Sequence, residues 1–123
     1  MSVQVGVDLV YIDRIEKILS RYPNRFLDRV LSEREKELFI ARGAKVETLA
    51  AAFAAKEAVL KALGCGIGPA ALIEVEVLTP TGKQPRVKLG GEAAKIAKEN
   101  NISGISVSMS HDPPYACAVA AAY

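Results

Sequence analysis

Hydrophobic and polar residues alternate in several segments of the chain and recur at helical spacing in the segments between them. Apolar positions 3, 5, 7 and 9 alternate with Gln4, Gly6 and Asp8, which predicts a half-buried strand with Asp8 on the face opposite the valines. Alternation also predicts strands at 73–77 and 105–109, and shorter or uniformly apolar runs predict strands at 86–89 and 116–122.

The remaining periodic segments predict helices. Isoleucine and leucine recur at helical spacing over 12–19, and Pro23 ends or kinks that helix. Ser32 and Glu35 form a capping-box pattern that starts a second helix, a long helix ends at Gly64, and a shorter one covers 92–100. This order predicts a single α+β domain over residues 1–123, with a largely antiparallel sheet packed on a long buried helix.

Residues 53–64 form an alanine-rich helix pattern that carries three charges although it is apolar on nearly every side. At 100° per residue, a lysine shares one arc with four large apolar residues: Leu49, Phe53, Lys56, Leu60 and Leu63. Glu57 and Lys61 also make an ordinary i,i+4 pair, which by itself implies no function. Charges in a dry interior are costly unless a ligand, metal or partner meets them. The helix therefore predicts an anion and a cation nearby.

Composition narrows the class of protein. Sixteen basic and fourteen acidic residues leave a net charge of +2, which is too small for a general nucleic-acid binder. No apolar stretch is long enough to span a bilayer, and residues 1–10 contain no basic leader, so we expect a cytoplasmic protein without a membrane partner. Cys65 and Cys117 are expected to be reduced thiols.

Asp8 and Glu57 are the best candidates for a divalent cation site. They are oxygen ligands from two elements, without a thiolate or histidine cluster beside them, which favours magnesium sharing its coordination with substrate phosphates. An alternative for Asp8 is a solvated carboxylate at a strand end. Gly6 lies two residues earlier on the same strand face and would let another backbone approach closely.

The single histidine, His111, follows two serines of one strand face, so that hydroxyls and an imidazole could meet a phosphate. The alternative is the polar face of a half-exposed strand. A serine hydrolase is disfavoured, because the chain has no GxSxG elbow and His111 directly follows Ser110.

The first helix and the residues after it are strongly basic. An ordinary solvated helix face explains this pattern, and the functional alternative is a surface that recognises an acidic partner through arginines and an aromatic anchor. The scarcity of other aromatics argues against single-stranded nucleic acid. The residues concerned are Arg14, Lys17, Arg21, Arg25, Phe26 and Arg29.

Three motifs together resemble holo-acyl-carrier-protein synthase, a 4′-phosphopantetheinyl transferase. They are Gly6-Val-Asp8, the highly specific block from Phe53 through Lys56-Glu57 and Lys61 to Gly64, and Ser108-Met-Ser110-His111. The resemblance runs from the first strand to the last in the same order. It implies transfer of 4′-phosphopantetheine from coenzyme A to a serine of apo acyl carrier protein, with release of adenosine 3′,5′-bisphosphate, in fatty acid biosynthesis.

The resemblance also implies a homotrimer with active sites between subunits, and roles for individual residues. Asp8, Glu57 and Lys61 would be catalytic, with magnesium held by Asp8 and Glu57. The coenzyme A-binding residues would be Lys61, Gly64, Ser110 and His111. The carrier-protein-binding residues would be Arg14, Arg21, Arg25, Phe26 and Arg29. The serine proton would pass to Glu57 or to a metal-bound water.

The chain departs from the family pattern at three places. Ala52 stands where members often have an arginine, so one phosphate contact is expected either to be missing or to be supplied by Arg42 or Lys45. Cys65 replaces a usual threonine, and the turn at 82–85 is one residue longer than usual. The motif leaves open whether Lys56 contacts ligand or pairs with a carboxylate inside the trimer.

Two other classes of function compete with this interpretation. A non-catalytic module would dock an acidic protein on its basic helix, with the buried charges serving assembly only. A magnesium-dependent phosphohydrolase would act on a small nucleotide without any carrier protein.

Overall fold

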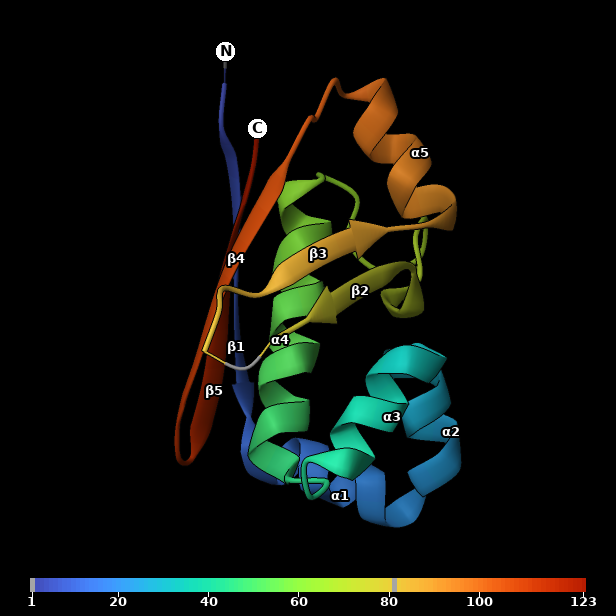
Figure 1. The fold of residues 1–123 in the computed structure, drawn as a ribbon, viewed down its shortest axis with the longest axis vertical. Helices are drawn as coiled ribbons and strands as arrows, with labels where there is room; N and C mark the ends of the chain where they lie inside the picture. The colour runs from blue at the N-terminus through green and yellow to red at the C-terminus, as the bar shows by residue number, and fades with distance from the viewer. Residues whose placement is uncertain (1, 81) are drawn as a thin grey trace.

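The computed structural model describes residues 2–80 and 82–123, and its centre is a long helix lying across one face of a three-stranded antiparallel sheet (Figure 1). This helix is α4 (Val46–Ala62), and the sheet has the order β1-β5-β4. The strands are β1 (Gln4–Tyr11), β4 (Ile105–Asp112) and β5 (Tyr115–Ala122). The predicted fold class is confirmed: an antiparallel sheet packs on a buried, alanine-rich helix.

Three short helices lie together at one end of α4, and a hairpin with a further helix covers the side away from the sheet (Figure 1). The helices are α1 (Ile12–Arg21), α2 (Pro23–Val30) and α3 (Glu33–Ala41). A 3-10 turn, η1 (Leu72–Glu74), leads into the hairpin β2 (Val75–Leu78) and β3 (Arg86–Leu89), which α5 (Gly91–Glu99) follows. Thr81, within the predicted turn 79–82, lies outside the described residues.

Local signals in the sequence explain several boundaries. Pro23 ends the first helical segment as predicted and then begins α2 at a position where its missing N–H costs nothing. Ser32 and Glu35 form both hydrogen bonds of the predicted capping box at the start of α3. Ile73, predicted to open a strand, lies in the 3-10 turn instead, and β2 begins at Val75.

The first strand buries the face that carries Gly6 and Asp8, and it exposes the face that carries its larger apolar residues. Gly6, Asp8 and Val10 face α4, whereas Val5, Val7 and Leu9 on the opposite face are exposed. The reason is close packing, because α4 presents fully buried alanines to the sheet and its backbone comes very near β1. A Cβ atom added to Gly6 would lie 2.0 Å from the carbonyl oxygen of Ala58. Only glycine permits this approach.

Candidate active site

The close approach of β1 and α4 brings Asp8 and Lys61 into contact. The ammonium group of Lys61 lies 3.1 Å from Asp8 Oδ1 and donates a hydrogen bond of 2.9 Å to the backbone carbonyl of Val7. The Asp8 side chain is largely buried and the Lys61 side chain is half exposed. Two residues singled out in separate sequence motifs therefore form one cluster at the edge of the sheet.

Glu57 belongs to the same cluster, one helical turn before Lys61. Burial raises the pKa of Glu57, and the neighbouring Asp8 carboxylate raises it further, while Lys61 and Arg14 act in the opposite direction. A pair of carboxylates that repel one another in a partly buried position is a favourable place for a cation. We call Asp8, Glu57 and Lys61 the carboxylate cluster.

The donor set of this cluster suits magnesium. Among the described residues, no group of three or more histidine, cysteine, aspartate or glutamate side chains gathers to hold a metal by itself. Two carboxylates would leave most coordination positions to water and to a phosphate-bearing ligand, which is the usual arrangement for magnesium. Both residues fit that ion, and neither offers the nitrogen or sulfur that zinc prefers.

Ser110 and His111 line a different region, a pocket of about 340 Å³. Arg42 and Ala52 also line this pocket, so Arg42 lies in the same wall region as the position where the family resemblance led us to expect an arginine. Lys45, the alternative candidate, does not line it. The pocket therefore combines a cation, an imidazole and apolar walls, which suits an aromatic, phosphate-bearing ligand. We call it the His111 pocket.

The two serines and His111 lie on different faces of β4, so their meeting at one phosphate stays a prediction. In the register of β4, Ser108 pairs with Val119 and Ser110 with Cys117, and both hydroxyls lie on the outer face of the sheet. His111 pairs with Ala116 and therefore lies on the face that packs against α4. Alternation along the strand separates adjacent side chains, so Ser110 and His111 act from opposite faces of one strand end.

Within one chain, α4 separates the carboxylate cluster from the His111 pocket. None of the three cluster residues lines that pocket. At 100° per residue, Glu57 lies about 180° around the helix from Thr48, a residue that does line it. The two candidate half-sites therefore lie on opposite sides of the same helix. Gly64 follows α4 with a positive φ of 83°, at the end of the helix nearest Lys61.

The basic residues of α1 and α2 lie on an exposed surface, but one predicted docking residue does not. Arg14, Arg21, Arg25 and Arg29 are all exposed. Phe26 is only 9% exposed and stacks on Phe53 of α4, with ring centroids 6.2 Å apart. Its prediction as an aromatic docking anchor is therefore wrong, because the ring belongs to the hydrophobic core.

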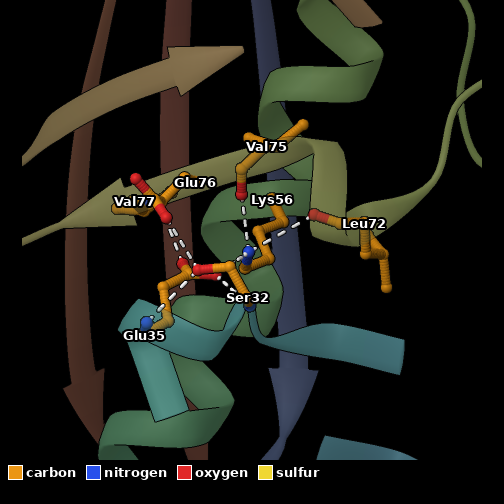
Figure 2. Close-up of polar contacts among 7 residues, drawn as sticks. All are labelled: Ser32, Glu35, Lys56, Leu72, Val75, Glu76 and Val77. Atoms are coloured by element: carbon orange, nitrogen blue, oxygen red, sulfur yellow. Dashed lines mark hydrogen bonds and ion pairs between the residues drawn. The ribbon is translucent and has the colours of Figure 1, made fainter. Parts of the chain in front are cut away.

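Lys56 has a partner inside its own chain (Figure 2). Its ammonium group lies 2.7 Å from Glu35 Oε1 and donates to the backbone carbonyls of Val75, at 2.5 Å, and Leu72, at 3.3 Å. The other carboxylate oxygen of Glu35 accepts a hydrogen bond of 2.9 Å from the Val77 amide. The Lys56 and Glu35 side chains are 0% and 4% exposed, so Lys56 presents no accessible surface to a ligand.

Sequence reasoning identified Glu35 only as a helix cap and missed this second role. Its Oε1 accepts hydrogen bonds both from the Ser32 amide of the capping box and from the Lys56 ammonium group. The available signal was that Lys56 needed a carboxylate partner and that Glu35 lies near the start of a neighbouring helix. Burial lowers the pKa of Lys56, and the Glu35 carboxylate counteracts that effect.

Comparison with known families agrees with this geometry. The family model described as the 4′-phosphopantetheinyl transferase superfamily matches residues 4–120. This chain belongs to the 4′-phosphopantetheinyl transferase superfamily. Among the described residues, no helix has both the length and the apolar composition needed to cross a membrane.

Curated relatives and solved structures narrow the assignment. The holo-[acyl-carrier-protein] synthase of Moorella thermoacetica is 42% identical over 117 residues, which are 95% of this chain and 91% of the relative. That of Sulfurovum sp. is 44% identical over 119 residues, covering 96% and 94% of the two chains. The family predicted from the motifs, holo-acyl-carrier-protein synthase, is confirmed, and with it the enzyme class of phosphopantetheinyl transferases.

Two solved structures share the fold over nearly their whole length. Holo-[acyl-carrier-protein] synthase from Neisseria meningitidis superposes with a TM-score of 0.86 at 31% identity, covering 98% of this chain and 97% of that one. The Helicobacter pylori enzyme in complex with coenzyme A gives a TM-score of 0.83 at 33% identity, covering 97% and 99%.

Proposed function

We propose that this protein transfers 4′-phosphopantetheine from coenzyme A to a serine of apo acyl carrier protein in a magnesium-dependent reaction. The observation that carries the proposal is the carboxylate cluster, because it joins residues of two separate sequence motifs, the first strand and the 53–64 block, in one polar site. The names of the relatives and the coenzyme A complex of the Helicobacter pylori enzyme support the same reaction. Adenosine 3′,5′-bisphosphate is the leaving product.

The chemistry asks the protein mainly for positioning and charge neutralisation. The serine oxygen of the carrier forms a bond to the phosphorus, and the bond from that phosphorus to the departing adenosine 3′,5′-bisphosphate breaks. Asp8 and Glu57 would hold magnesium, which neutralises pyrophosphate charge when bound. Lys61 lies beside them and supplies a further positive charge. The serine proton would pass to Glu57 or to a water held by the metal.

Coenzyme A would extend from the carboxylate cluster to the His111 pocket. His111 would hold the nucleotide end, with Ser110 on the outer face of the same strand end, and Arg42 would supply the phosphate contact that Ala52 lacks. Lys61 and Gly64 would bind nearer the pyrophosphate. The exposed arginines of α1 and α2 would dock the acidic carrier. This surface lies near the carboxylate cluster, since the charge of Arg14 is close enough to lower the pKa of Glu57.

A homotrimer with active sites between subunits explains two features of the chain. The outer face of the sheet exposes Val5, Val7, Leu9 and Val119, which is more contiguous apolar surface than a monomer usually shows. The two half-sites also lie on opposite sides of α4, so that a neighbouring subunit would complete each site. Residues 1–123 would form one transferase domain. The protein would act in the cytoplasm, in fatty acid biosynthesis.

One mass measurement tests the reaction. The protein is incubated with coenzyme A, magnesium and apo acyl carrier protein, and the carrier is expected to gain one phosphopantetheine group. No gain across several carriers would reject the proposal. A docking module would bind the carrier and leave its mass unchanged, even with chelator present. A phosphohydrolase would release product from coenzyme A without any carrier.

Subunit mixing tests the shared site. Asp8→Asn removes a residue of the carboxylate cluster and His111→Ala removes one of the pocket, so each homotrimer should be nearly inactive. Co-expressed chains should regain about one quarter of the wild-type rate, because random association places both intact halves at that fraction of sites. A co-expressed mixture no more active than either variant would contradict sites between subunits. Purified homotrimers assayed side by side serve as the control.

A further inference from the structure

The His111 pocket has two walls that come from different parts of the chain. One wall consists of α3 and β2, represented by Phe39 and Val77. The other consists of α4 and the end of β4, represented by Ala52 and Met109. Since these walls belong to separate elements, the width of the pocket depends on what fixes α3 and β2 relative to α4.

Lys56 makes that connection through a buried polar network (Figure 2). It lies on α4 one turn after Ala52, and its side chain reaches Glu35 at the start of α3 and the Val75 carbonyl at the start of β2. Glu35 in turn binds the Val77 amide in the wall itself. Within the described part of the chain, no buried side-chain nitrogen or oxygen lacks a hydrogen-bond partner, so the network is fully satisfied.

A buried ion pair is poor evidence for a gain in stability. Removing two charges from water costs nearly as much as their attraction returns, and apolar residues of similar size often replace such pairs without loss. The pair instead fixes how α4, α3 and β2 lie relative to one another, because hydrogen bonds require a defined distance and direction between the groups they join. A role in geometry therefore explains the pair better than a role in stability alone.

We propose that Lys56 and Glu35 are positioning residues that fix the width of the His111 pocket and thereby its affinity for the nucleotide end of coenzyme A. The proposal rests on the proposed function, in which coenzyme A occupies this pocket. Lys56 is the cleaner probe, because its side chain is 0% exposed and does not line the pocket, whereas Glu35 does. Any effect of Lys56 on coenzyme A binding must be transmitted through the walls.

Steady-state kinetics with varied coenzyme A test this role. Lys56→Met, and the charge-neutral double variant Glu35→Gln/Lys56→Met in case the single variant folds poorly, should raise KM for coenzyme A about tenfold while kcat changes by less than about twofold. Leu60→Ala is the matched control. Leu60 is on the same helix, fully buried and outside the pocket, so its loss should lower the folded fraction without moving KM.

Titration of coenzyme A into each protein, followed by calorimetry, gives a readout independent of turnover and should show the same weakening. An unchanged KM and an unchanged dissociation constant in a folded Lys56 variant would overturn the positioning role. Failure of the wild-type protein to modify any carrier would instead reject the proposed function, so the two failures are distinguishable.

Discussion

Glu57→Gln is expected to lower the rate of phosphopantetheine transfer by on the order of 10³-fold, which combines losses of metal binding and of proton transfer. The substitution keeps the shape of the side chain and removes only its charge. The rate should be measured by mass spectrometry of the carrier at saturating coenzyme A and magnesium. Glu47→Gln is the matched control, because it makes the same change in the first turn of the same helix. That variant should retain full turnover.

The same substitution has an opposite effect on stability. A carboxyl group whose pKa is raised by folding contributes stability at pH values below its ordinary pKa of 4.5. That contribution is lost as the pH rises through the pKa of the folded state. In chelator, Glu57→Gln should therefore melt at a higher temperature than wild type at neutral pH, and at the same temperature under acidic conditions. Full turnover together with unchanged magnesium binding would contradict both the metal role and the base role of Glu57.

Lys56→Met is expected to lower the free energy of unfolding by about 3–5 kcal/mol, because it leaves the Glu35 carboxylate buried without a counter-charge. Urea denaturation measures this loss. Lys61→Met is the control on the same helix. Its ammonium group is half exposed, so its salt bridge with Asp8 should contribute no more than about 1 kcal/mol.

A double-mutant cycle separates the pair from its surroundings. Adding Glu35→Gln to Lys56→Met neutralises the stranded charge and should recover part of the lost stability. The recovery should be incomplete, because the Glu35 carboxylate also accepts hydrogen bonds from the Ser32 and Val77 amides. Additive losses in the cycle would mean that the two side chains do not interact.

Most of the fold could be predicted from local patterns. Alternation located β1 and β4, an apolar run located β5, the capping box located α3, and the apolar pattern of 53–64 indicated that its helix is buried. These signals depend on residues close together in sequence. The prediction that failed locally was at Ile73, where a 3-10 turn satisfies the backbone before the strand begins.

The candidate site was harder to predict, because it depends on how elements that are distant in the sequence pack together. The sequence assigned Phe26 to the surface, since it lies among arginines, but α2 turns this ring onto Phe53. It placed the β4 serines and His111 together, although the strand separates them. Lys56 appeared without a partner because Glu35 lies 21 residues earlier and was already explained by its cap. The packing between elements determines where each of these side chains lies, and a local sequence pattern does not predict that packing.

The close packing at Gly6 also restricts the register in which β1 can pair. A slip of β1 by one residue would turn Asp8 to the outer face and press a valine against α4. A slip by two would bring the side chain of Gln4 or Asp8 to a point where even a methyl group lies 2.0 Å from the helix backbone. Each wrong pairing is blocked by the shape of α4. The missing Cβ atom of Gly6 thus helps to determine that Asp8 faces the candidate catalytic helix.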